Sequence, residues 1–72
     1  MTPAELGKIV REARRAAGIT QEQLAGASGV SVRFLIELEA GKPTVQLGKA
    51  LAVLETLGGR VMVDIPSGPE FR

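Results

Sequence analysis

The chain has 72 residues, of which 44% are hydrophobic, and it carries a formal net charge of +1. A chain this short forms one domain at most and hides only about 60% of the surface that its unfolded form exposes. It contains no cysteine and no histidine, which excludes a disulfide scaffold and a structural zinc site. The fold must therefore depend on a compact apolar core, on oligomerisation or on both.

The composition also argues against catalysis, because the chain lacks His, Cys, Tyr and Trp. These absences remove the usual general base, the thiol nucleophile and the soft metal ligands. No apolar run approaches the roughly 18 residues that a membrane span needs, and the N-terminus lacks the apolar stretch of a signal peptide. We therefore expect a cytoplasmic protein that is not an enzyme, does not enter a membrane and needs no cofactor or metal.

The first helix is predicted by its capping residues and by the spacing of its apolar side chains. Thr2 and Glu5 are placed for a capping box, and Pro3 between them suits the first helical position. We expect this helix to end at Gly18 in a left-handed conformation. Apolar residues recur at helical spacing along one of its faces, namely Leu6, Ile9, Val10, Ala13 and Ala17.

Two shorter helices are predicted next. Thr20 and Gln23 form a second capping box, which predicts a helix over residues 21–27. Ser31 is placed to cap a third helix over residues 32–40. Short helices joined by a tight glycine-containing turn are typical of the helix-turn-helix unit.

The last third of the chain changes its period. A fourth helix is predicted to have Thr44 as its cap and to end at Gly58, with apolar residues at Val45, Leu47, Leu51, Leu54 and Leu57. Polar and apolar residues then alternate as in a β-strand, over Arg60, Val61, Met62, Val63, Asp64 and Ile65. Two prolines follow closely, so we expect residues 66–72 to be a flexible tail after a helical domain over residues 1–59.

The residues around the predicted turn carry a more specific pattern. They are Thr20-Gln21-x-x-Leu24-Ala25, Gly29-Val30-Ser31, Leu35 and Leu38-Glu39-x-Gly41-Lys42. These segments resemble the Cro/C1 repressor family, and the likeness runs from about residue 6 to residue 57. The resemblance implies a mostly α-helical bundle of four or five helices that acts as a transcriptional repressor on double-stranded DNA.

Helical periodicity separates an inner and an outer face of the third helix. Leu35 and Leu38, together with Val30, are spaced to pack inward. Arg33 and Glu37 project about 160° to 200° away from Leu35, at roughly 100° per residue. Both side chains should therefore point outward, where they could face the major groove.

The family resemblance implies which residues contact DNA. Arg33 is the main candidate, because its guanidinium can hold guanine O6 and N7 with two hydrogen bonds, worth about 1 to 3 kcal/mol of discrimination. Glu37 would either accept from a cytosine amine or repel the DNA backbone. Gln21 would contact phosphate or brace the third helix, and Lys42 would contact phosphate. The residues nearest the base edges would be Ser31, Val32, Arg33 and Glu37.

Two other pairs of residues have structural interpretations beside functional ones. The resemblance implies that Arg14 and Glu39 form an ion pair between the first and third helices. Phe34 and Ile36 have three possible roles, which are packing against the fourth helix, forming a partner-binding patch and contacting a thymine methyl group.

The predicted strand over residues 60–65 implies a dimer. A lone strand leaves its amides and carbonyls without a ladder, and the chain supplies no second strand. The economical solution is a homodimer in which this segment pairs antiparallel with its symmetry mate. Residues 20–42 hold two basic and three acidic residues, so this segment by itself is slightly acidic and would bind DNA weakly. Dimerisation would strengthen the binding. Both first helices would then add basic residues, among Lys8, Arg11 and Arg15.

With the strand included, the resemblance narrows to HipB-like antitoxins. It rests on Gly41-Lys42-Pro43-Thr44-Val45, Leu54-x-x-Leu57-Gly58 and Val61-Met62-Val63. It implies a homodimer that binds an inverted-repeat operator, represses its own operon and binds a HipA-type serine/threonine kinase toxin. Two alternatives stay open: a protein-interaction module that neutralises a partner with little DNA binding, and a phage or plasmid regulator without a toxin.

Overall fold

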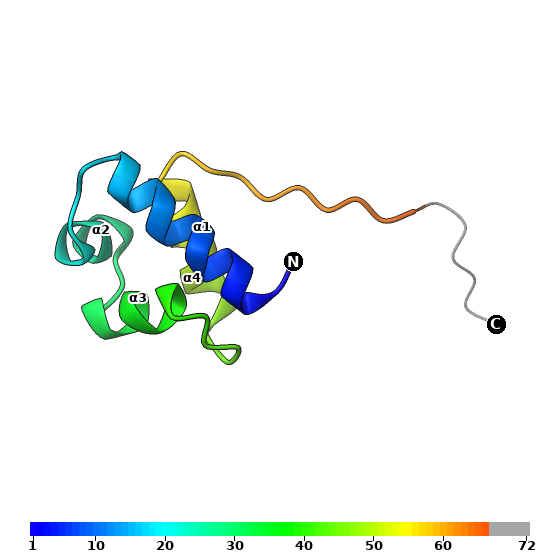
Figure 1. The fold of residues 1–72 in the computed structure, drawn as a ribbon, viewed down its shortest axis with the longest axis horizontal. Coiled ribbons are helices and arrows are strands. Elements are labelled where there is room, and N and C mark those ends of the chain that lie inside the picture. Colours follow the sequence, from blue (N-terminus) through cyan, green and yellow to red (C-terminus); the bar gives the residue numbers. More distant parts are fainter. Residues whose placement is uncertain (67–72) are drawn as a thin grey trace.

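The computed structural model describes residues 1–66, and within them the chain forms four α-helices joined by short turns (Figure 1). α1 packs against α3, and α2 packs against both α3 and α4. The expected helical bundle with a helix-turn-helix at its centre is thereby confirmed. Within residues 1–66, no helix is long and apolar enough to cross a membrane. The four helices are α1 (Pro3–Ala16), α2 (Gln21–Ser28), α3 (Val32–Glu39) and α4 (Leu47–Thr56).

Local capping chemistry starts the first three helices. The capping box predicted for α2 is complete, since Thr20 Oγ1 accepts from the Gln23 amide at 3.0 Å and Gln23 Oε1 accepts from the Thr20 amide at 2.9 Å. At α1, Thr2 Oγ1 accepts from the Glu5 amide at 3.1 Å, and Ser31 caps α3 in the same one-sided way. Each cap satisfies an amide that has no partner inside its helix.

The turn between α2 and α3 depends on a left-handed glycine. Gly29 has φ 72° and ends α2, and this conformation costs glycine little because it lacks a Cβ. The amide of the next residue, Val30, then donates to the carbonyl of Ala25 at 3.0 Å. The chain thus turns within three residues, and Ser31 caps the start of α3.

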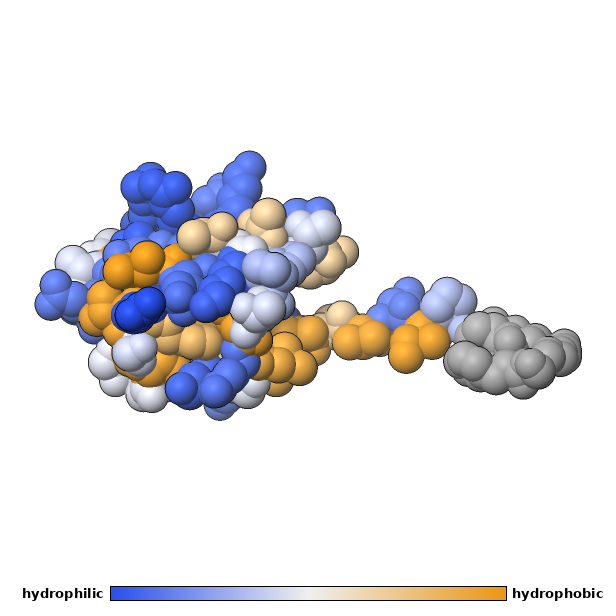
Figure 2. All heavy atoms as spheres, turned by 90° about the horizontal axis from the view of Figure 1, so that it is seen from below, coloured by the Kyte–Doolittle hydropathy of each residue, from blue (hydrophilic) through white to orange (hydrophobic). Residues whose placement is uncertain are grey.

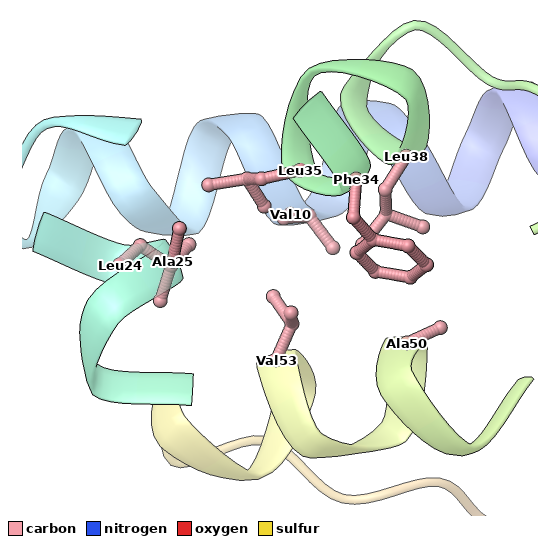
Figure 3. Close-up of a cluster of buried hydrophobic side chains, with 8 residues drawn as sticks. All are labelled: Val10, Leu24, Ala25, Phe34, Leu35, Leu38, Ala50 and Val53. Carbon is pink, nitrogen blue, oxygen red and sulfur yellow. The ribbon is translucent and has the colours of Figure 1, made fainter. Parts of the chain in front are cut away.

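Eight buried side chains from all four helices form the core (Figure 3). α3 supplies three of them, so its inner face is held from several directions. Phe34 is one of these three, with 8% of its surface exposed, whereas Ile36 is 48% exposed. The structure therefore assigns packing to Phe34 and leaves Ile36 at the surface. The core residues are Val10, Leu24, Ala25, Phe34, Leu35, Leu38, Ala50 and Val53.

The prediction that Thr44 caps the fourth helix is wrong. α4 begins at Leu47, and its cap residue, Gln46, makes no side-chain hydrogen bond to the helix. The preceding Val45 packs against the core as a partly buried residue, and Gln46 is extended with ψ 123°. Because Val45 packs on the core, residues 45 and 46 stay outside the helix, although a cap at Thr44 would have placed them in its first turn.

The apolar face of α4 also differs from the predicted one. Leu47 and Leu51 are 69% and 41% exposed, whereas Ala50 and Val53 are buried. α4 is apolar around most of its circumference, so its periodicity does not determine which side faces the core. A similar difference occurs in α1, where Ile9 is 46% exposed.

Residues 60–65 form no strand within the described part of the chain, so the predicted strand remains unconfirmed. A strand requires ladder hydrogen bonds, and residues 1–66 of a single copy hold no other strand to which this segment could pair. The segment leaves the bundle and runs away from it (Figure 1), and apolar surface continues onto it from the helical body (Figure 2). Its apolar side chains are all more than half exposed, namely Val61, Met62, Val63 and Ile65. The predicted tail over 66–72 lies outside the described residues from position 67 onward.

α1 and α3 lie in close backbone contact at Gly7. A Cβ placed on this residue would meet the backbone oxygen of Leu38 and would lie 2.7 Å from that of Glu39. Backbone atoms at a helix end cannot move aside without displacing α3. Gly7 is therefore required by packing, and its own helical conformation would suit any residue.

We expect Gly7→Ala to destabilise the protein by about 1–3 kcal/mol, because the added methyl group overlaps α3. In an open helix interior the same substitution stabilises by up to about 1 kcal/mol. Gly26 in α2 is the matched control, since a Cβ there meets nothing within 4 Å. Urea unfolding should move the two midpoints in opposite directions. Two variants that shift the midpoint the same way would contradict the close packing of α1 on α3.

Candidate nucleic-acid interface

The outward face of α3 holds the residues that helical spacing placed there. The Arg33 side chain is 88% exposed and that of Glu37 is 32% exposed. Val32 and Ser31, at the start of the helix, are also at the surface. The Arg33 and Glu37 side chains lie on the side of α3 away from the buried Leu35, whereas Ser31 and Val32 are exposed because they stand at the start of the helix. α3 therefore presents a polar surface that the core does not need.

A shallow groove runs between α3 and the start of α4. Three of the side chains along it are cationic: Arg33, Lys42 and Lys49. Lys49 was not among the sequence-predicted site residues. Its Nζ lies 5.9 Å from the centroid of the Phe34 ring, within reach of a cation–π interaction. The groove is lined by Ser31, Arg33, Phe34, Glu37, Lys42, Thr44, Val45, Gln46 and Lys49.

Glu37 forms ion pairs with two of the three cations in this groove. Lys42 Nζ donates to Glu37 Oε2 at 3.1 Å, and Arg33 Nε lies 3.9 Å from the same oxygen. The Lys42 side chain is 46% exposed. Ion pairs this exposed contribute little to stability. Their main consequence is to set where the two cations lie in the unbound protein.

A third ion pair joins α1 to α3, as the family resemblance implied. Arg14 Nε donates to Glu39 Oε2 at 2.7 Å, and Arg14 Nη2 donates to Oε1 at 3.1 Å. The two side chains are 12% and 5% exposed. Gln21 Nε2, at the first residue of α2, also donates to Glu39 Oε1 at 3.1 Å. Gln21 therefore braces α3, which is one of the two roles expected for it.

These contacts keep the part-buried pair charged. Burial by itself raises the pKa of the Glu39 carboxyl group, but the hydrogen bonds from Arg14 and Gln21 outweigh it and lower the pKa below its ordinary value. The hydrogen bond to Glu39 raises the pKa of Arg14 in turn. Glu39 is therefore ionised in the folded protein at neutral pH, with both carboxylate oxygens used to join helices.

The lowered pKa of Glu39 predicts a dependence of stability on pH. Ionised Glu39 stabilises the fold above its unfolded pKa of about 4.3, and this contribution is lost as pH falls through the lower folded pKa. We expect Glu39→Gln to lose about 1–3 kcal/mol at pH 7, because Arg14 keeps a part-buried charge without its partner. The same variant should lose less further stability than the wild type on acidification.

Urea unfolding at pH 7, 5 and 3 measures this difference. Glu12→Gln is the control for the removal of one carboxylate, since Glu12 is exposed on α1. This control should follow the wild-type dependence on pH. A Glu39→Gln profile parallel to that of the wild type would show that the pair does not link folding to pH.

A further shallow groove lies between α1 and α3. Two of the helix-1 cations considered from the sequence, Arg11 and Arg15, line it together with Gln21 and Ile36. Lys8, the third of them, is exposed but is not part of this groove. α1 thus adds positive charge next to the start of α2.

The predicted dimerisation residues lie apart from these grooves. Arg60 and Val61 line a separate groove at the end of α4 with Leu51, Leu54, Glu55 and Gly59. The structure therefore brings Arg33, Glu37 and Lys42 together in one groove. Gln21 contacts α3 by its hydrogen bond to Glu39. The structure does not bring residues 60–65 to that groove.

Comparison with known proteins places the same segments in a family. The model of a family described as helix-turn-helix matches residues 10–61. An HTH-type transcriptional regulator of Sinorhizobium fredii is 49% identical over 65 residues, which cover 90% of this chain and 86% of the relative. An HTH-type transcriptional regulator of Methanothermobacter thermautotrophicus is 37% identical over 57 residues, covering 79% of this chain and 83% of the relative.

Proposed function

Because the chain belongs to the helix-turn-helix family, we propose that it is a sequence-specific DNA-binding transcriptional regulator that acts as a repressor. The observation that supports this most is the outward face of α3, where the exposed Arg33 lies in one groove with Lys42 and Lys49. The major groove of DNA admits one α-helix. No catalytic activity forms part of the proposal.

In the proposed complex α3 enters the major groove. Val32, Arg33 and Glu37 face the base edges, with Arg33 on guanine. Lys42 and Lys49, on either side of the α3–α4 turn, face phosphates and position the helix. Ser31 adds a hydroxyl at the start of α3. The Arg14–Glu39 pair beneath holds α3 at a fixed angle, so the base contacts are preorganised.

We expect Arg33→Ala and Lys42→Ala to weaken DNA binding in different ways. Loss of Arg33 should remove about 1–3 kcal/mol of discrimination at one base position, because a bidentate contact to guanine is lost. Loss of Lys42 should weaken binding to all sequences alike and reduce the slope of log affinity against log salt by about 1. Fluorescence anisotropy with a duplex selected from a random pool, and with its scrambled version, separates the two effects.

Both variants remove one positive charge, so each serves as the charge-matched control for the other. An Arg33→Ala variant that keeps the wild-type preference for the selected duplex would refute its role as the base-reading residue.

The proposal includes a homodimer formed through residues 60–65. Its support is the alternating pattern of the segment, the exposure of its apolar side chains and the additional exposure of Leu47 and Leu51 on α4. In such a dimer the two copies of α3 enter successive major grooves about 34 Å apart and bind an inverted repeat. Each recognition face is small, so two of them are needed for adequate affinity.

Ending the chain after Gly59 tests the dimer. The truncated protein should keep the helical bundle, because every core residue within the described residues 1–66 lies in α1 to α4, and it should be monomeric at concentrations where the full chain is dimeric. Light scattering or analytical ultracentrifugation gives the mass, and circular dichroism confirms folding. A truncated protein that remains a tight dimer would exclude pairing through this segment.

The antitoxin role is a narrower part of the proposal. It is supported by the likeness of residues 41–45, 54–58 and 61–63 to HipB-like proteins. A HipA-type kinase encoded beside this chain, and retained with it during purification, would support the role. A neighbourhood without such a kinase favours the phage or plasmid regulator, which shares the DNA mechanism.

The alternative from a different class is a protein-interaction module with little DNA binding. It is favoured by the acidic balance of residues 20–42, which hold Glu22, Glu37 and Glu39 against Arg33 and Lys42. The salt dependence of binding separates the two functions. A DNA-binding protein shows a steep fall of log affinity with log salt, whereas absence of duplex binding at low salt would favour the interaction module.

A further inference from the structure

Glu37 is the one carboxylate among the residues that line the groove between α3 and α4 in the described part of the chain. It is 32% exposed and contacts two cations, with Lys42 Nζ at 3.1 Å and Arg33 Nε at 3.9 Å from the same oxygen. Both cations belong to the face that the proposed function places on DNA. A negative charge at this position therefore needs an explanation.

We infer that Glu37 is a specificity-determining residue that weakens binding to non-cognate DNA by holding Lys42 and Arg33 in the unbound protein. This inference rests on the proposed DNA-binding function and adds a role that opposes binding. Glu37 acts partly through Lys42, so it is a positioning residue for that phosphate contact.

The first step of the argument is competition for Lys42. Its ammonium group donates to Glu37 in the unbound protein, and it must turn toward a phosphate to contribute to DNA binding. The carboxylate then loses its closest cation while it lies near the DNA backbone. Like charges brought within about 8 Å of each other still repel at physiological salt, because screening is incomplete over that distance, so this cost applies to any duplex.

The second step is that cognate DNA offsets this electrostatic repulsion with hydrogen bonds, whereas other DNA does not. A carboxylate in the major groove can accept a hydrogen bond from the N4 amine of cytosine. Arg33, once released from Glu37, can bind the guanine of a neighbouring pair. Non-cognate DNA offers no donor at the matching position. Glu37 therefore widens the ratio of specific to non-specific affinity while it lowers non-specific affinity.

The third step is that Glu37 is not needed for the fold. α3 is held by Phe34, Leu35 and Leu38 in the core and by Glu39 on another side. The two ion-pair partners of Glu37 among the described residues are Arg33, with 88% of its side chain exposed, and Lys42, with 46% exposed. Glu37→Gln preserves size and hydrogen-bonding capacity and removes the charge, so the variant should fold as the wild type does.

The experiment compares full-length wild type, Glu37→Gln and Glu12→Gln. Glu12 lies exposed on α1, on the side opposite the buried Val10, so its variant removes the same charge away from the groove. The probe is a scrambled duplex of about 25 base pairs, long enough for two half-sites one helical turn apart. Anisotropy titrations over a series of salt concentrations give affinity and salt slope.

For Glu37→Gln we expect affinity for the scrambled duplex to rise about threefold or more, and the salt slope to steepen by about 0.9 for each positive charge that Glu37 no longer neutralises. Glu12→Gln should change both much less. Selection from a random duplex pool should yield less sequence preference with Glu37→Gln than with the wild type. Combining Glu37→Gln with Lys42→Met should remove the change in slope, which a purely structural role of Glu37 would not do.

Equal affinity and slope for the Glu37→Gln and Glu12→Gln variants would overturn the inference while leaving the proposed function in place. Binding of the scrambled duplex by Glu37→Gln, where the wild type binds it only at lower salt, would support the inference. If neither protein binds any duplex at low salt, the proposed function fails and the inference fails with it.

Discussion

The contact among Arg14, Gln21 and Glu39 determines how α1, α2 and α3 meet. Apolar packing alone tolerates small rotations of a helix, whereas two hydrogen bonds from Arg14 and one from Gln21 to the same carboxylate do not. Part-buried charges are costly unless all of them are satisfied, so the three helices must keep one relative orientation. The direction in which Arg33 points depends on that orientation.

Two glutamates of α3 have different roles, one in helix packing and one at the outward groove. Glu37 and Glu39 are separated by two positions, which places them roughly 200° apart around the helix. Glu39 is 5% exposed and joins helices, whereas Glu37 is 32% exposed and pairs with cations of the outward groove. The carboxylate of Glu39 is structural because Arg14 and Gln21 surround it. The carboxylate of Glu37 is available for recognition because solvent reaches it.

The features that the sequence predicts well are those decided by neighbours along the chain. The capping box of Thr20 and Gln23 is such a feature, because both hydrogen bonds join residues three positions apart. The helix-turn-helix and the outward placement of Arg33 also follow from helical spacing and a left-handed glycine. The Arg14–Glu39 pair spans 25 positions, and its prediction came from the family resemblance rather than from any local pattern.

Tertiary structure decided the features that depend on distant parts of the chain. α4 starts at Leu47 because Val45 packs on the core, although Thr44 is a good local cap. Lys49 lies in the candidate groove, with its Nζ 5.9 Å from the centroid of the inward-packed Phe34 ring. α4 is apolar around most of its circumference, so only its packing against α2 decided which of its sides is buried. By itself the sequence determined where the first three helices begin and which side of α3 faces outward, because those features depend on local caps and spacing. Only the fold decided which distant side chains share the groove, because those contacts depend on helix packing.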